Sequence, residues 1–166
     1  VMTMAKATTN GVVPMGVVAV KEEIYDTVMD ASPKGAVELF HGYTYSGIPV
    51  SVAAALAVQD IFDKENVFKK AKEMSPYFLD GIFSLKDLDA VDNIRGYGMM
   101  AGIDIKLKEK PGRAGFECFK ACYDAGVNFK ATGDCLIIAP QFICEKKHID
   151  EIIEKLRTGI SNYMKK

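Results

Sequence analysis

The sequence predicts an α/β fold in which the end of a large domain is followed by a small α+β domain. Two patterns support this prediction. A short apolar strand and helix lead into an alanine-rich helix, and from Asp87 onward the order becomes strand, strand, helix, strand, strand, helix. The chain starts with Val1 and enters an apolar run at once, so we expect a piece of a longer protein. We expect residues 1–64 to end the large domain, 65–86 to form a linking helix, and 87–166 to form the small domain.

Composition narrows the class of protein. Of 166 residues, 49% are hydrophobic, which is enough for a real core. The 21 basic and 22 acidic residues are mixed along the chain, so we expect no nucleic-acid partner and no acidic membrane surface. The apolar run at 48–58 is too short to cross a bilayer. Four cysteines without a secretory leader indicate reduced thiols in a cytoplasmic protein.

The first part of the chain predicts one strand and two helices. Gly16–Val20 is apolar and β-rich, which is typical of a short buried strand. Acidic residues open a short helix at Glu22–Met29, since negative charge is favourable at a helix N-terminus. Turn residues follow, and Pro49 suits the first position of a helix that continues to about Lys64, because its missing N–H has no partner there anyway.

The clearest amphipathic helix lies between Asn66 and Lys86. Its apolar residues repeat with a period of 3.6, and Pro76 is expected to kink or split it. The residues expected to face inward are Val67, Phe68, Ala71, Met74, Phe78, Leu79, Ile82 and Phe83.

Two pairs of strands, each followed by a helix, make up the predicted small domain. The strands at 91–95 and 99–105 flank Gly96-Tyr97-Gly98, and those at 127–131 and 135–139 flank a three-residue loop at 132–134. The first helix spans Gly115–Ala125 and is closed by Gly126, with Phe116, Phe119, Cys122 and Tyr123 expected inward. The last helix spans Lys147–Met164, with Ile149, Ile152, Ile153, Leu156 and Ile160 expected inward.

Lys6 is the first chemical candidate. No other charge precedes Lys21, so Lys6 stands alone among small and apolar residues. Burial disfavours the ammonium form, and a neutral amine can attack a carbonyl carbon to form a Schiff base. The alternative interpretation is a lysine at a strand end whose amine reaches water past its own methylenes.

A second candidate lies just before the helix at Pro49. His41–Gly47 crowds hydroxyl groups and glycines in front of a helix N-terminus, where free N–H groups and a partial positive charge favour a phosphate. The alternative is an N-capping turn with two packed tyrosines.

These stretches together resemble the class III aminotransferases, pyridoxal-phosphate enzymes of fold type I, and most closely the ω-amino acid (β-alanine)–pyruvate branch. The segments that resemble the family's cofactor-lysine region are Thr3–Lys6, Thr9–Gly11 and Pro14–Gly16. Those that resemble its phosphate-threonine region are Ala36–Glu38, His41–Gly47 and Pro49. Arg95–Gly102 is similar to a strand motif of the small domain, and Gly133-Asp134 to the hairpin near the substrate site. The resemblance implies the C-terminal portion of this fold.

The resemblance also implies roles for individual residues. Lys6 would bond to pyridoxal 5'-phosphate and move a proton during the reaction. Thr44, with the backbone of Tyr43, would bind the cofactor phosphate across the interface of a homodimer with shared active sites. The substrates would be an amino acid or amine donor and a keto acid acceptor such as pyruvate.

The chain departs from the family in two respects. Lys130 stands where an arginine usually grips the substrate carboxylate, and lysine keeps the charge but loses the two-pronged guanidinium. The residues that precede the lysine in the family lie outside this sequence: the acid that pairs with the pyridine nitrogen, the aromatic that stacks on the ring, and the glycine/serine phosphate loop. We therefore expect the isolated chain to be inactive.

Other functions stay open at this point. The same fold supports racemisation and decarboxylation, and a non-catalytic α+β interaction module is an alternative of a different class. Gly96-x-Gly98 is similar to part of a dinucleotide-binding loop, but a predicted strand and not a helix follows it. We therefore interpret it as a tight turn. Zinc binding by Cys118 and Cys122 would need His41 or His148, and we expect no metal because these cysteines lie among core residues.

Overall fold

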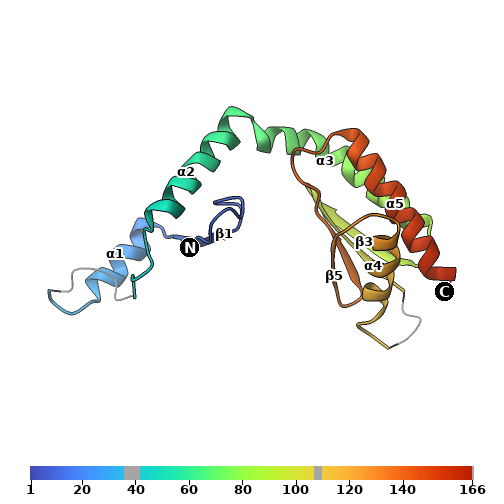
Figure 1. The fold of residues 1–166 in the computed structure, drawn as a ribbon. Coiled ribbons are helices and arrows are strands. Elements are labelled where there is room, and N and C mark those ends of the chain that lie inside the picture. Colours follow the sequence, from blue (N-terminus) through green and yellow to red (C-terminus); the bar gives the residue numbers. More distant parts are fainter. Residues whose placement is uncertain (36–41, 107–109, 166) are drawn as a thin grey trace. The chain divides into compact units, whose positions relative to one another are not determined.

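The computed structural model describes residues 1–35, 42–106 and 110–165. The chain separates into two compact units, Val1–Glu65 and Asn66–Lys166 (Figure 1). The helix expected to link two domains belongs to the second unit. In the part of the chain that the structure describes, no helix has both the length and the apolar composition needed to cross a bilayer.

The first unit contains a two-stranded antiparallel sheet and two helices. Strand β1 (Met2–Ala5) pairs with β2 (Gly16–Ala19), and helix α1 (Glu22–Asp30) follows. The strand at Gly16 and the helix at Glu22 confirm the sequence prediction. The expected burial of β2 is wrong for this chain, because Val18 is 63% exposed on the two-stranded sheet.

Helix α2 (Pro49–Lys64) confirms the predicted helix and begins with proline at its first position. Only Ser51 and Val58 of this helix are buried, whereas Val50 and Leu56 are about two-thirds exposed. The first unit therefore has little core of its own, although its sequence is apolar.

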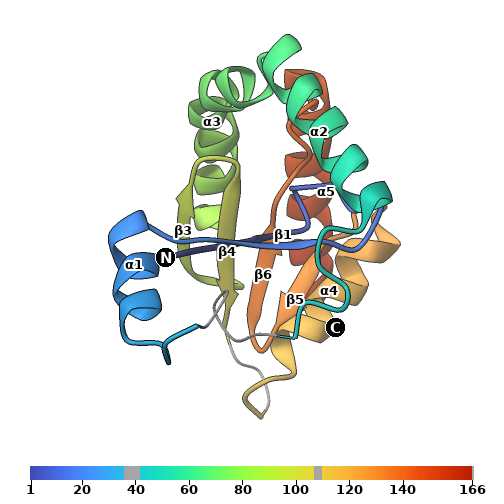
Figure 2. The ribbon, with the colours of Figure 1, turned by 90° about the vertical axis from the view of Figure 1, so that its left-hand side faces the viewer.

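The second unit is a four-stranded antiparallel sheet covered by helices on one face (Figures 1 and 2). Its strand order is β3-β4-β6-β5. The strands are β3 (Val91–Tyr97), β4 (Met100–Ile105), β5 (Lys130–Thr132) and β6 (Cys135–Ile138). The covering elements are α3 (Val67–Phe83), the 3-10 helix η1 (Ser84–Asp87), α4 (Ala114–Asp124) and α5 (Lys146–Lys165).

Alternation along the strands divides the sheet into a core face and an open face. Ala101, Ile103 and Ile105 of β4 are buried, whereas Gly102 and Asp104 lie on the opposite face and are half-buried. The described core cluster lies entirely within the second unit. The open face carries charged strand residues such as Arg95 and Asp104, so a polar site on the sheet would lie on this face.

Helix α3 runs through Pro76 without interruption, so the predicted split is wrong. Val67, Ala71, Phe78 and Ile82 are buried as expected. Phe68 and Phe83, which were expected inward, are exposed.

The inward face of α4 agrees with the prediction at Cys122 but not at Phe116 and Tyr123, and the reason is close packing. Small residues face the core, namely Ala114, Gly115, Cys118, Ala121 and Cys122. Phe116 and Tyr123 are exposed instead. A Cβ on Gly159 of α5 would lie 2.5 Å from the Cα of Cys122, so the two helices leave no room for rings between them. Gly126, with φ +92°, closes α4 as predicted.

Both hairpins are tighter than predicted. Strand β3 continues to Tyr97, which pairs with Met100, so the turn falls at Gly98-Met99. Thr132 pairs with Cys135, so the second loop contains two residues, Gly133-Asp134. Gly98 and Gly133 have φ of +60° and +58°, a region that side chains disfavour. The interpretation of Gly96-x-Gly98 as a tight turn is confirmed only for Gly98, because Gly96 and Tyr97 belong to β3.

Candidate functional site

Lys6 follows directly on β1 in a strained conformation. Its φ is +57°, which is uncommon for a residue with a side chain and typical of functional turns. Its carbonyl oxygen accepts hydrogen bonds from the N–H groups of Thr9 (3.3 Å) and Gly11 (3.1 Å), which close the turn. The side chain is exposed, which agrees, for this chain, with the alternative interpretation of a lysine at a strand end and not with apolar burial of the amine.

The threonines after Lys6 stiffen this turn. Thr9 is buried, and its hydroxyl donates to the carbonyl oxygen of Val13 at 2.6 Å. The Oγ1 atom of Thr8 is buried and has no hydrogen-bond partner among the described residues. A buried hydroxyl without a partner is costly, so the loop offers an unsatisfied polar group close in sequence to the Lys6 amine.

Tyr43 and Thr44 lie in a turn that leads into α2. The Ser46 N–H donates to the carbonyl oxygen of Tyr43 at 2.9 Å, and Gly47 has φ +66°. Thr44 is exposed. Ile48 at the N-cap of α2 makes no side-chain capping bond, so no side chain at that position competes for the positive end of the helix. Ala36–Glu38 and His41 of the same motif lie outside the described residues.

A hydrogen bond joins the Lys6 region to the helix that follows Thr44. The buried Ser51 in the first turn of α2 donates to the carbonyl oxygen of Pro14 at 3.3 Å. Lys6 and Thr44 thus belong to the same compact unit, whereas Lys130 belongs to the other.

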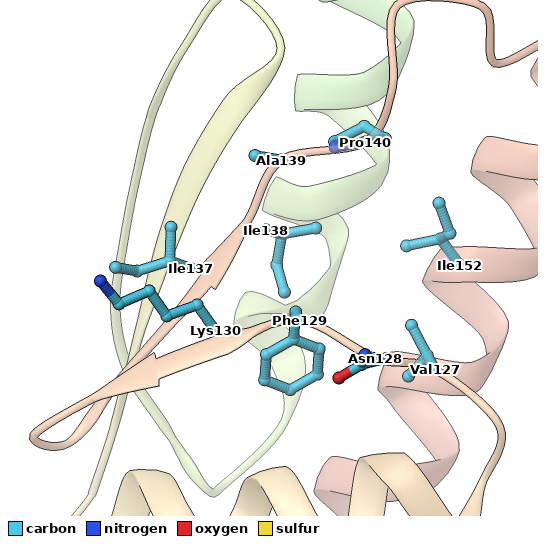
Figure 3. Close-up of a pocket in the computed structure, with 9 residues that line it drawn as sticks. All are labelled: Val127, Asn128, Phe129, Lys130, Ile137, Ile138, Ala139, Pro140 and Ile152. Atoms are coloured by element: carbon cyan, nitrogen blue, oxygen red, sulfur yellow. The ribbon is translucent and has the colours of Figure 1, made fainter. Parts of the chain in front are cut away.

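Lys130 stands on β5, at the edge of the sheet. Its cross-strand partner is Ile137, and Figure 3 shows the two side chains pointing to the same side. Lys130 is exposed, and no described carboxylate forms an ion pair with it. It borders a pocket of about 340 Å³ lined by Val127, Asn128, Phe129, Lys130, Ile137, Ile138, Ala139, Pro140 and Ile152 (Figure 3). The pocket lining is mainly apolar, and Figure 3 shows the Lys130 amine pointing away from Phe129 and Ile152.

A charged cluster on the open face was not singled out by the sequence. The Arg95 guanidinium donates to Asp104, and its other nitrogen lies 3.4 Å from the Cys135 sulfur. The hydrogen bond from Arg95 lowers the pKa of Asp104 and raises that of Arg95. Burial, followed by the neighbouring Asp104, raises the pKa of the Cys135 thiol. Arg95 and Cys135 border a pocket of about 490 Å³.

The sequence could have predicted this cluster, but only with knowledge of the register between β3 and β4. Arg95 pairs with Gly102, and Asp104 lies two residues further along the same face of β4. Gly102 has no side chain, and the Arg95 guanidinium lies over it, 3.5 Å from where a Cβ would be. The pair could be predicted only once the hairpin turn was placed correctly.

The cysteines of α4 are buried side by side. Cys118 and Cys122 are fully buried, and the neighbouring Cys122 and desolvation raise the pKa of Cys118. Among the described residues, no group of three or more histidine, cysteine, aspartate or glutamate side chains is arranged to hold a metal ion.

Comparisons with known proteins agree with the resemblance. The aminotransferase class-III family model matches residues 1–160. An omega-aminotransferase of Caulobacter vibrioides is 39% identical over 155 residues, which cover 93% of this chain and 35% of that protein. A beta-alanine–pyruvate aminotransferase of Pseudomonas aeruginosa is 37% identical, covering 96% and 36%. The chain thus spans about a third of the length of these relatives.

A solved structure extends the likeness to the fold. The adenosylmethionine-8-amino-7-oxononanoate aminotransferase of Methanocaldococcus jannaschii is 28% identical, with a TM-score of 0.86, covering 96% of this chain and 38% of that one. The family match extends over nearly the whole sequence and includes both compact units. The chain therefore belongs to the class III aminotransferases, a family of pyridoxal-phosphate-dependent enzymes of fold type I.

Proposed function

We propose that this chain is the C-terminal portion of an aminotransferase that moves an amino group from an ω-amino acid or amine to a keto acid such as pyruvate. The observation that carries the proposal is the family match over residues 1–160, with Lys6 in the strained turn after β1. Among its relatives, proteins named for ω-amino acids, β-alanine and pyruvate are 35–39% identical.

The residues present suit pyridoxal phosphate. Lys6 offers an exposed amine, Thr8 an unsatisfied hydroxyl, and the turn at Thr44 a hydroxyl close in sequence to a helix N-terminus. Pyridoxal phosphate supplies an aldehyde for the amine and a ring that accepts electrons from the substrate. Lys6 would bond to that aldehyde and, once displaced by substrate, carry the proton between carbons. Thr44 and the Tyr43 backbone would hold the phosphate beside the positive end of α2.

Thr44 would serve the site of a sister subunit, which makes the working enzyme a homodimer with shared active sites. Val50 and Leu56 of α2 are about two-thirds exposed, and burial of such apolar residues in the homodimer would be consistent with this proposal.

Lys130 would recognise the substrate carboxylate. Lys130 is exposed, it is among the residues that line an apolar pocket, and no carboxylate among the described residues forms an ion pair with it. An ammonium group attracts a carboxylate as a point charge but lacks the paired N–H groups of arginine, so we expect looser orientation of the substrate.

The test is substrate profiling of the full-length enzyme with β-alanine as donor and pyruvate as acceptor. Formation of alanine in proportion to donor consumed supports aminotransfer. Release of carbon dioxide, or inversion of a chiral donor without alanine, would instead identify decarboxylation or racemisation on the same fold. The isolated chain lacks the acid that pairs with the ring nitrogen, so we expect no turnover from it and no substrate-responsive absorption band with added cofactor.

A further inference from the structure

Asp134, in the tight loop between β5 and β6, binds backbone groups from other parts of the chain. Its carboxylate oxygens accept hydrogen bonds from the N–H of Gly112 (2.7 Å) and the N–H of Ala114 (2.9 Å). Its carbonyl oxygen accepts from the N–H of Ile105 at the end of β4 (2.9 Å). One residue therefore ties the tip of the β5–β6 hairpin to β4 and to the start of α4.

The start of α4 has no side-chain cap of its own. Arg113 at the N-cap position makes no capping hydrogen bond, so the Asp134 carboxylate supplies one from a distant part of the chain. A carboxylate is also favoured by the positive end of the helix. The approach is close, because a Cβ on Gly115 would lie 2.3 Å from the carbonyl oxygen of Gly133. The hairpin tip is thus held against the helix by backbone contact as well as hydrogen bonds.

This anchor bears on Lys130, which lies on the same hairpin. Strand β5 comprises the three residues Lys130–Thr132, and among the described strands it pairs only with β6, so few ladder hydrogen bonds fix it. At its start, the ring of Phe129 packs edge-on against Phe119 of α4 at 5.4 Å between centroids. At its end, the strand is held through Asp134. Both attachments lead to α4, and Lys130 lies between them in the sequence.

We propose that Asp134 is a positioning residue that sets where the Lys130 amine stands, and hence how well the enzyme distinguishes donors that carry a carboxylate. The proposal rests on the role of Lys130 in carboxylate recognition. Without the Asp134 bonds, β5 loses its attachment at one end, and the amine is no longer fixed relative to the sheet.

The experiment measures kcat/KM of the full-length enzyme for β-alanine and for propylamine, which has a methyl group in place of the carboxylate. Lys130→Met should lower the β-alanine-to-propylamine ratio about tenfold, because one charged contact is lost. Asp134→Ala should lower the same ratio several-fold, and Asp134→Asn, which keeps one acceptor oxygen, should lower it less. In the Lys130→Met background, Asp134→Ala should change the ratio no further. Asp124→Ala, at the far end of α4, is the matched control and should leave the ratio unchanged.

Two outcomes would overturn the proposal, and they are distinct. If Lys130→Met shifts the ratio but both Asp134 variants lower kcat/KM equally for the two donors, Asp134 serves folding alone. If Lys130→Met leaves the ratio unchanged, the role proposed for Lys130 fails and the positioning role fails with it. Asp134→Asn keeps the test valid even if Asp134→Ala does not fold.

Discussion

At the residue scale, the identity of Lys6 was predictable from the sequence, but its surroundings were not. A single charge among small and apolar residues singled it out. Its φ of +57° depends on a turn closed by the N–H groups of Thr9 and Gly11, which no hydrophobic pattern encodes. The sequence left both burial and exposure of Lys6 open, because burial depends on what packs against a segment and not on the neighbours in sequence alone.

The Arg95–Asp104 pair gives a pH-dependent prediction. Arg95 lowers the folded-state pKa of Asp104 below its ordinary value of about 3.9. The pair therefore contributes stability above the unfolded-state pKa, and this contribution is lost as pH falls through the folded-state pKa. We expect Asp104→Asn to be less stable than the wild type at neutral pH, with the difference shrinking as the solution is acidified below about pH 4.

Urea unfolding of the chain at a series of pH values measures this difference. Arg95→Met provides the control, since Asp104→Asn in that background should show a much weaker dependence on pH. Parallel stability curves for wild type and Asp104→Asn across the acidic range would contradict the assignment.

At the scale of elements, the existence and order of the helices and of every strand except β1 could be predicted, while some faces and turns could not. Periodicity located α2, α3, α4 and α5 close to their observed bounds. On α4, Cys122 is buried as predicted, but Phe116 and Tyr123 are exposed, because hydrophobicity alone places the large rings inside whereas the contact with α5 admits only small residues. The predicted loop at 132–134 was one residue too long, because cross-strand register is set by the pairing of the two strands and not by the local sequence.

The close contact between α4 and α5 predicts a strong effect of Gly159→Ala. The new Cβ would meet the Cα of Cys122 at 2.5 Å and its nitrogen at 2.8 Å, and backbone atoms cannot rotate away. We expect a loss of about 1–3 kcal/mol in the free energy of unfolding. Denaturant unfolding of the chain measures it.

Gly81→Ala in α3 is the matched control for this overpacking. Its Cβ would meet only the side chain of Ile153, at 3.0 Å, which can shift, and alanine favours a helix over glycine. The effect should therefore be much smaller. If Gly159→Ala lost no more free energy of unfolding than Gly81→Ala, then α4 and α5 could move apart at little cost, which would contradict this prediction.

At the scale of the whole molecule, the two units differ in how far their own residues stabilise them. No residue of α1 is buried, and α2 buries two, whereas the described core cluster lies entirely in the second unit. Sequence alone could not show this difference, because the first unit also contains many apolar residues and composition does not reveal what packs against them.

Amide hydrogen exchange of the isolated chain should report the difference. We expect α1 and α2 to exchange with little protection, while α4, α5 and β4 exchange only through global unfolding. In the full-length dimer, α2 should become protected, since the proposal places its apolar residues in further contacts. Protection of α2 equal to that of α5 in the isolated chain would show that the first unit is stable without them.

The covalent attachment of the cofactor decides whether Lys6 has the proposed role. The full-length enzyme is incubated with pyridoxal phosphate, reduced with borohydride, digested, and its peptides are mapped by mass spectrometry. We expect the label on the peptide that contains Lys6, its loss in Lys6→Ala, and its retention in Lys21→Ala, which removes the next lysine along the chain. A label on another lysine of a folded, active enzyme would contradict the assignment of Lys6.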